Sequence, residues 1–134
     1  MTRPAVPTRP EANRVCDPGF SWEEARATVR EDGGLLRELV EAALVETEKQ
    51  WNMMQRALAD RDSRALRLAA HSLKGSVRYF GETEVYREAL RVERCVRDGN
   101  VEWQNIFLDQ LGRALEMVRQ ELTEYIGQGE LNEQ

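Results

Sequence analysis

The sequence predicts an all-α protein, an antiparallel up-down-up-down four-helix bundle preceded by a short N-terminal helix. Three observations support this fold class. Strong helix formers, chiefly Ala, Leu, Glu and Arg, dominate the chain after residue 20. Four long stretches carry apolar residues at spacings of three and four positions, the pattern of an amphipathic helix. The connections between these stretches are short, so consecutive helices are expected to run in opposite directions.

The chain of 134 residues is expected to form one folded domain with two loosely structured ends. Residues 1–19 hold all four prolines and show almost no apolar periodicity, so they are predicted to be a disordered leader. The helical bundle is predicted over residues 20–127. Residues 128–134 are mostly polar and are predicted to be a frayed tail.

The short first helix is predicted in the stretch SWEEARATV. Ser21 is its candidate N-cap, and Glu24 follows three residues later as in a capping box. The stretch EDGG, residues 31–34, is expected to end this helix. A second helix then runs to ADRD, residues 59–62. Its apolar stripe consists of Leu35, Leu36, Leu39, Val40, Ala43, Trp51, Met54 and Leu58.

Three further helices follow at short intervals. The first of them is predicted over residues 63–80, with Asp62 as N-cap and Gly81 as a left-handed residue at its end. The next lies in ETEVYREALRVERCVRDGN and is closed by the Gly-Asn pair of that stretch. The last is predicted to begin near residue 101. Its apolar residues recur at the spacings of a bundle seam: Leu108, Leu111, Leu115, Val118, Leu122 and Tyr125.

Composition and charge exclude several classes of function. The net charge is -5 with acidic and basic residues interleaved, which argues against a nucleic-acid binder. No apolar run approaches the roughly 20 residues of a membrane span, and the N-terminal stretch lacks the apolar core of a signal peptide. A cytoplasmic protein is therefore expected. Cys16 and Cys95 have no metal-ligand or redox spacing, so they are predicted to be reduced thiols without a role.

His71 is the only histidine, and helical periodicity predicts that it points into water. At about 100° per residue the apolar side chains of this helix share one arc, and His71 lies about 160° from the centre of that arc. A histidine buried in the core is therefore disfavoured, whereas an exposed histidine without function remains an alternative. The predicted buried arc consists of Leu66, Ala69, Ala70, Leu73, Val77 and Phe80.

The neighbours of His71 favour a functional site. Gly75 lies one turn later, where a glycine inside a helix costs about 1 kcal/mol relative to alanine, so close approach by another surface is expected. Lys74 is one of two lysines beside 17 arginines, and a compact ammonium suits a small anion. Leu68 is an apolar residue on the outer face. Basic side chains surround the site, namely Arg64, Arg67 and Arg78.

An exposed imidazole in this setting suits acceptance of a phosphoryl group at a ring nitrogen. A neutral imidazole is nucleophilic near pH 7, whereas a hydroxyl needs a base. Positive neighbours can offset charge on the transferring group, and the glycine leaves room for the donor. No carboxylate lies one turn away on the same side of this helix, so the residues leave the tautomer of His71 open.

The stretch AAHSLKGSVRYFG resembles the motif of histidine phosphotransfer (HPt) domains, which reads approximately A-H-x-L-K-G-S-(small)-x-x-(apolar)-G. Flanking stretches are also similar to that family, namely FSWEEARATVREDGGLLRELVEAALVE before the motif and LRVERCVRDGN after it. The chain departs from the pattern at Val77, where a small residue is usual, and at Arg78 and Tyr79. The last two departures bear on the choice of partner. The motif residues that match are Ala70, His71, Leu73, Lys74, Gly75, Ser76, Phe80 and Gly81.

The resemblance implies a phosphocarrier of a multistep two-component phosphorelay. His71 would accept phosphate from an aspartate of one receiver domain and pass it to another, with Lys74 assisting electrostatically and Gly75 giving room. Arg67, Leu68 and Arg78 are expected to contact the partner. The implied partners are response-regulator receiver domains and a hybrid histidine kinase, and a monomer without cofactor is expected. In this family Mg²⁺ belongs to the receiver.

Two alternatives belong to other classes of function. A dimerisation segment of a histidine kinase carries an acidic residue after its histidine and a proline a few residues later. Here Ser72 follows His71, no proline occurs after Pro18, and no glycine-rich ATP lid is present, so autokinase activity is not expected. A bundle of the same fold that binds receiver or kinase domains as a non-phosphorylated adaptor remains an alternative.

Overall fold

The computed structural model describes residues 17–99 and 108–132, with side chains described as far as residue 128. Every regular element in these two segments is helical, which confirms the predicted all-α class. The expected beginning of the last helix near residue 101 lies outside the described residues. The elements in chain order are α1 (Trp22–Thr28), α2 (Gly33–Asp60), α3 (Ser63–Val77), the 3₁₀ turn η3 (Arg78–Phe80), α4 (Glu84–Arg97) and α5 (Leu108–Asn132).

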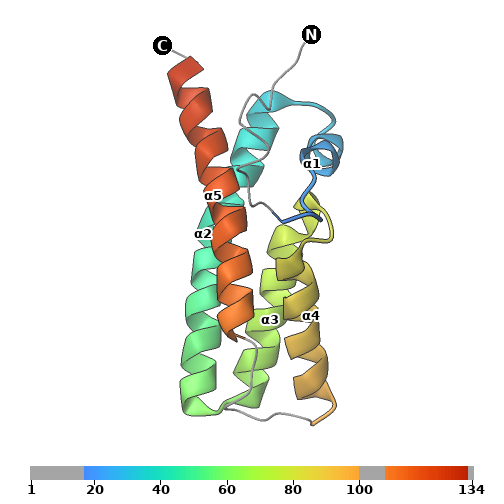
Figure 1. Ribbon diagram of the computed structural model, residues 1–134, viewed down its shortest axis with the longest axis vertical. Helices are drawn as coiled ribbons and strands as arrows, with labels where there is room; N and C mark the ends of the chain where they lie inside the picture. Colours follow the sequence, from blue (N-terminus) through green and yellow to red (C-terminus); the bar gives the residue numbers. More distant parts are fainter. Residues whose placement is uncertain (1–16, 100–107, 133–134) are drawn as a thin grey trace.

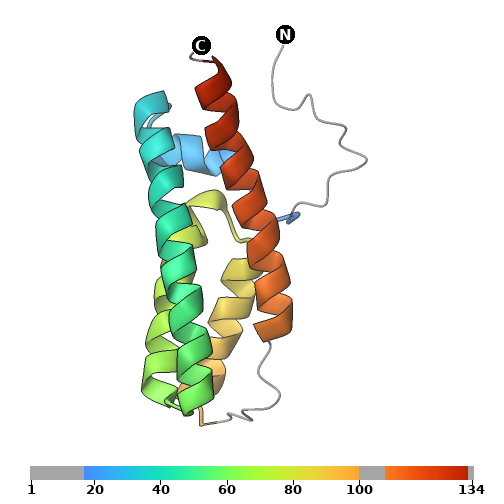
Figure 2. The same ribbon diagram turned by 90° about the vertical axis from the view of Figure 1, so that its left-hand side faces the viewer.

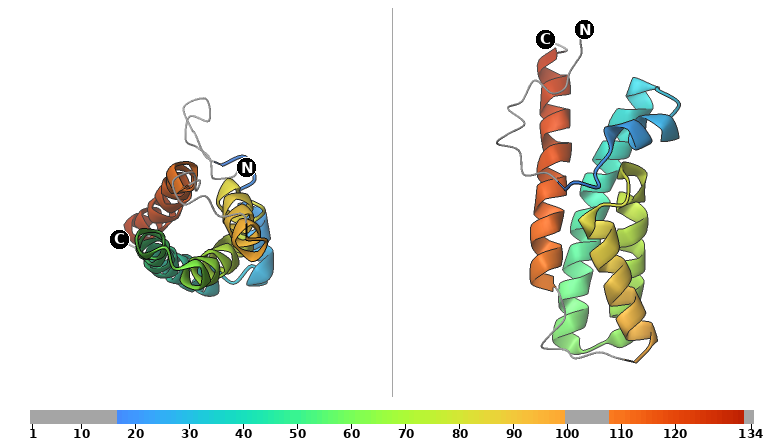
Figure 3. Two further views of the ribbon diagram at one scale, coloured as in Figure 1. Left: turned by 90° about the horizontal axis from the view of Figure 1, so that it is seen from below. Right: turned by 45° about the vertical axis from the view of Figure 1, so that its right-hand side comes forward.

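The four long helices lie lengthwise beside one another, and α1 crosses one end of them (Figure 1). Viewed from the end in Figure 3, they follow one another around a common core in the order α2, α3, α4, α5. Helix α3 therefore lies between α2 and α4 and packs against both. In Figure 2, α1 lies across the bundle near the upper end of α2, and its most extensive packing is against η3. None of the described helices is long and apolar enough to cross a membrane.

The buried face of α3 and η3 agrees with the helical-wheel prediction. Leu66, Ala69, Ala70, Leu73, Val77 and Phe80 are all completely buried. The predicted α2 stripe is only partly buried, because Leu35 lies in the first turn of α2 and is exposed. Trp51 of that stripe is half-buried and packs on α5, where its ring lies 3.1 Å from the position that a Cβ on Gly112 would take.

Side-chain caps define where the helices begin. The predicted caps Ser21 and Asp62 are confirmed: Ser21 Oγ accepts from the backbone NH of Glu24 at 3.1 Å, and Asp62 Oδ1 accepts from that of Ala65 at 3.0 Å. Helices α2 and α4 begin with equivalent caps from Asp32 and Thr83.

The break between α1 and α2 lies near the predicted stretch EDGG. Helix α1 ends at Thr28, and the chain reverses through two non-glycine residues in the left-handed region, Arg30 at φ 55° and Glu31 at φ 63°. Gly33 and Gly34 form the first turn of α2. Asp32 then caps α2, so the cap determines the boundary and the glycines do not.

Residues directly before α1 are packed on the connection between η3 and α4. Asp17 is buried, and its carboxylate accepts hydrogen bonds from the backbone NH groups of Gly19 and Glu84. Ser21 NH donates to the carbonyl of Phe80 at 2.7 Å. Residues 17–19 of the expected leader therefore belong to the folded part, because the Asp17 carboxylate accepts a hydrogen bond from the backbone NH of Glu84 at the start of α4. Residues 1–16 lie outside the described residues.

Gly81 is required for a reason other than the one predicted. Its φ of 102° and ψ of -179° do not correspond to a left-handed helical cap. A Cβ here would lie 2.4 Å from the carbonyl oxygen of Gly19, so only glycine permits the close approach of the two segments. At the other end of the chain, α5 continues to Asn132, past the predicted boundary at residue 127.

An aromatic cluster joins α1, η3 and α5 at this end of the bundle. Phe20 stacks on Phe80 with ring centroids 5.4 Å apart, and Trp22 contacts both of these rings and that of Tyr125. The indole NH of Trp22 donates to Glu121 Oε2 at 2.8 Å. These contacts fix the end of α3 and therefore the helix that carries His71.

Candidate functional site

The site is centred on the outer face of α3. His71 lies opposite the buried arc, and 63% of its side chain is exposed, as the periodicity predicts. The next turn of the same face carries Gly75, which is also exposed. A Cβ built on Gly75 would meet nothing within 4 Å, so packing inside the protein does not require glycine at this position.

Helix α4 brings a carboxylate to the histidine. Glu93 Oε2 lies 2.8 Å from His71 Nδ1, and Glu93 Oε1 lies 2.9 Å from Lys74 Nζ. One carboxyl group therefore contacts two side chains of α3 that are one turn apart. Only 16% of the Glu93 side chain is exposed, because the neighbouring Val92 is part of the core and holds this stretch of α4 against α3.

The ionisation of Glu93 follows from these contacts. Burial acts to raise the pKa of this carboxyl group, but hydrogen bonds and charge from Lys74 and His71 act in the opposite direction and prevail. The pKa of Glu93 is therefore lowered below its ordinary value of 4.5. At neutral pH the group is a carboxylate that can only accept hydrogen bonds.

The carboxylate settles which ring nitrogen of His71 carries hydrogen. An ionised Glu93 has no proton to donate, so the contact at 2.8 Å requires an NH at Nδ1. In the neutral ring Nε2 is then unprotonated and holds a lone pair. The sequence left this tautomer open, and the fold resolves it through a residue of another helix.

Lys74 has a different environment from the one expected. Its ammonium group is paired with Glu93, and only 19% of the side chain is exposed. In this arrangement Lys74 orients the carboxylate that holds the histidine. A direct contact of Lys74 with a phosphoryl group stays a prediction.

The expected docking residues lie on different edges of α3. Arg78 is near α4, where its Nη1 donates to the hydroxyl of Tyr86 at 3.3 Å and its guanidinium lies 6.0 Å from the centre of that ring. Leu68 lies on the edge away from α4 and is exposed. Arg67 is exposed as well. The structure thus places all three around His71 and leaves their role in docking as a prediction.

Glu93 is the site residue that the sequence analysis missed. Tyr86 and Glu93 are seven residues apart, so they lie on one side of α4, and that side faces α3. This spacing is a weak signal for a site, since many surface helices carry polar residues in this pattern. Pairing Glu93 with His71 also requires the register between α3 and α4, which the sequence does not provide.

Metal-binding clusters are absent from the described segments, where no group of three or more His, Cys, Asp or Glu side chains could hold an ion. Cys95 is a free, half-exposed thiol on α4. Cys16 lies outside the described residues.

Comparisons with known proteins identify the family. Residues 38–121 match the model of the Hpt domain, a range that includes both His71 and Glu93. The chain belongs to this family, whose members transfer phosphoryl groups in two-component signalling. Histidine-containing phosphotransfer protein B from Pseudomonas aeruginosa PAO1 has a similar structure, with a TM-score of 0.75 and 20% sequence identity. The similarity covers 83% of this chain and 96% of that one. A search of curated proteins finds no match.

Proposed function

We propose that this protein is a phosphocarrier of a multistep two-component phosphorelay. It accepts a phosphoryl group from a receiver aspartate on His71 and passes it to another receiver. The observation that carries the proposal is the contact of Glu93 with Nδ1 of an exposed His71, which leaves Nε2 available to attack. The carrier is an up-down-up-down bundle of α2 to α5, with α1 as the short helix before it.

The transfer step can be written with its atoms balanced. The Nε2 lone pair attacks the phosphorus of the receiver's aspartyl phosphate, an N–P bond forms, and the P–O bond to the aspartate breaks. The electron pair of that bond stays on the aspartate, which leaves as a carboxylate. The imidazole ring becomes cationic, and Glu93, still accepting from Nδ1, offsets this charge. Transfer to a second receiver is the same step in reverse.

Each side chain of the site has a part in this step. Glu93 orients the ring and stabilises its positive charge, while Lys74 fixes the second carboxylate oxygen. Gly75 leaves the surface one turn beyond His71 without a side chain, so the receiver can approach closely. Arg67, Leu68 and Arg78 contact the receiver around this point.

The proposed partners are receiver domains of response regulators and a hybrid histidine kinase. The chain acts as a monomer in the cytoplasm, binds neither nucleic acid nor membrane, and needs no cofactor of its own. Mg²⁺ is supplied by the receiver. Since no ATP-binding motif accompanies the histidine in the sequence, the protein is a carrier of phosphate and not a kinase.

Phosphoryl transfer from purified receivers tests the proposal. Receiver domains from the same genome are phosphorylated with acetyl phosphate, freed of it and mixed with the protein. A base-stable, acid-labile phosphoryl group is expected on the wild type and not on His71→Gln. The variant should unfold cooperatively at nearly the wild-type temperature, because the residue is exposed.

The adaptor alternative predicts another result in the same experiment. If receivers bind the wild-type protein but none transfers phosphate to it, the phosphocarrier proposal is overturned. Equal labelling of His71→Gln would also contradict it, since the phosphoryl group would then be on another residue.

A further inference from the structure

Four exposed apolar side chains come from α2, α3 and η3. They are Val45 and Met53 of α2, Leu68 of α3 and Tyr79 of η3, and each is at least 44% exposed. We refer to these four residues as the apolar edge. Single exposed apolar residues are ordinary on protein surfaces, whereas a group of them on one face indicates a contact with a partner.

Helical geometry places the two α3-side members on the edge away from α4. His71 and Lys74 both reach Glu93, so the Lys74 side of His71 is the side of α4. Leu68 is displaced about 60° from His71 in the opposite sense. Tyr79 lies in the 3₁₀ turn, where each residue adds about 120°, and is displaced about 120° in the same sense as Leu68. Since α3 lies between α2 and α4, these two side chains are on the α2 side.

The two members on α2 lie at about the same heights along the bundle as the two members on α3 and η3. Helices α2 and α3 are joined by a tight turn at Arg61 and Asp62. At 1.5 Å per residue, Met53 is about 12 Å and Leu68 about 9 Å from this turn. Val45 is about 24 Å and Tyr79 about 26 Å from it. The apolar edge therefore forms two pairs, one at each end of the segment that carries His71 and Gly75.

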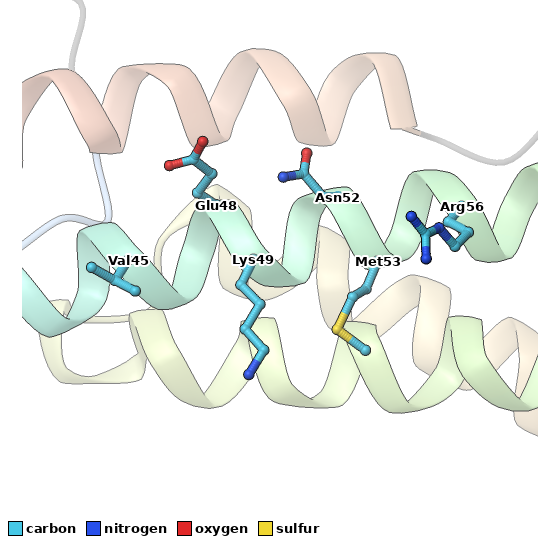
Figure 4. A pocket seen from close by; sticks show the side chains of 6 residues that line it. All are labelled: Val45, Glu48, Lys49, Asn52, Met53 and Arg56. Carbon is cyan, nitrogen blue, oxygen red and sulfur yellow. The ribbon is translucent and has the colours of Figure 1, made fainter.

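The outer side of α2 is hollowed beside these residues. An open depression of about 480 Å³ is lined by Val45, Glu48, Lys49, Asn52, Met53 and Arg56. Figure 4 shows Lys49 and Met53 pointing to the side of α2 on which α3 lies, while Glu48 and Asn52 point toward α5. The side chain of Met53 thus continues the surface around Leu68.

Charge indicates the chemistry of the occupant. Lys49 and Arg56 border the apolar edge on α2. Arg64 of α3 is exposed and is displaced about 20° from His71 in the same sense as Leu68. The acidic member of the depression, Glu48, is already 3.7 Å from Arg119 of α5. This region is therefore basic although the whole chain carries a net charge of -5. A complementary partner surface is apolar with an acidic rim.

We infer that the receiver docks asymmetrically, extending from His71 across the apolar edge onto α2 with an apolar surface that has an acidic rim. The inference rests on the proposed function, because the receiver's phosphorylated aspartate must reach His71. The edge toward α4 contributes less to affinity, since Lys74, Glu93 and Arg78 there already have partners. Val45, Lys49 and Met53 are then docking residues outside the sequence motif.

Glutamate substitutions on α2 test the inference. Met53→Glu and Val45→Glu, each made alone, are compared with Leu35→Glu, which makes an equivalent change at an exposed residue of α2 about 12 Å beyond the end of η3. The rate of phosphoryl transfer is measured against the concentration of a phosphorylated receiver. In parallel, phosphoramidate serves as a small phosphodonor that needs no docking surface.

The expected result separates docking from chemistry. Met53→Glu and Val45→Glu should raise the half-saturating receiver concentration by about tenfold or more. Their rates at saturation, and their labelling by phosphoramidate, should equal those of the wild type. Leu35→Glu should behave as the wild type in every measurement. Lys49→Glu should also weaken binding of the receiver, and this loss of affinity should be smaller at high salt.

Other outcomes overturn the inference and can be told apart. Unchanged half-saturation in both α2 variants, with transfer to the wild type intact, removes α2 from the docking surface and keeps the proposed function. Failure of every receiver to label the wild type overturns both the inference and the proposed function. If sedimentation finds a wild-type dimer that Met53→Glu converts to a monomer, the apolar edge is covered by a second copy of the chain.

Discussion

The two edges of α3 differ in what they offer to a partner. On the edge toward α4, the Glu93 carboxylate contacts both His71 and Lys74. On the same edge Arg78 donates a hydrogen bond to the hydroxyl of Tyr86. The edge toward α2 carries the exposed apolar side chains of Leu68 and Tyr79. The contrast teaches that a single helix can hold its histidine in place along one side and expose apolar side chains along the other.

Removal of the Glu93 carboxylate should have the largest effect on the α4 edge. Glu93→Ala is expected to slow labelling by both phosphoramidate and receivers by about 10- to 100-fold. In Ser-His-Asp hydrolases loss of the orienting carboxylate costs about 10⁴-fold, and less is expected here because His71 does not need to relay a proton. Initial rates of phosphohistidine formation measure the effect.

Glu93→Gln is the matched control for this change. Its amide oxygen can still accept from Nδ1 but carries no charge, so its rate should lie between those of the wild type and Glu93→Ala. Wild-type rates in Glu93→Ala would show that the carboxylate is structural only.

Gly75 lies between the two edges, and its substitution should slow transfer from a receiver without destabilising the fold. Gly75→Ala is expected to raise the free energy of unfolding by about 0.5–1 kcal/mol, because alanine is the better helix former and its Cβ meets nothing within 4 Å. Transfer from a receiver should nevertheless fall by about tenfold, since a methyl group holds the partner away. Thermal unfolding and transfer rates are measured on the same sample. A faster transfer would contradict the role assigned to the glycine.

Lys74→Ala should have a smaller effect, of the same kind as that of Glu93→Ala. Without the ammonium the carboxylate is less firmly placed, so labelling by phosphoramidate is expected to slow by about three- to tenfold. The double variant Lys74→Ala, Glu93→Ala should be little slower than Glu93→Ala alone, because both changes act through one carboxylate. Full additivity of the two free-energy changes would instead indicate a direct contact of Lys74 with the phosphoryl group.

Acid stability is the smallest expected difference. The folded protein holds the pKa of Glu93 below 4.5, so this group contributes stability above that pH and loses the contribution as pH falls through its folded pKa. The expected contribution is about 1 kcal/mol or less. Urea unfolding at pH 7 and pH 3 should show a larger loss for the wild type than for Glu93→Gln. Equal losses would contradict the lowered pKa.

The sequence predicts the face of α3 well and its surroundings less well. Periodicity within one helix suffices to bury Leu73 and expose His71, because both lie on the same continuous element. Glu93 could not be assigned, since its contact depends on the register of two helices. The break after α1 falls next to the predicted stretch EDGG, but the sequence does not indicate that Arg30 and Glu31 adopt positive φ.

The position of the phosphoryl group on the ring tests the central claim most directly. The protein is labelled with ¹⁵N-histidine, phosphorylated by a receiver and studied by ³¹P and ¹⁵N NMR in mild base. With Glu93 holding Nδ1, phosphorus should be coupled to Nε2 of His71 alone. Phosphate on Nδ1, or on a residue other than His71, would contradict the account.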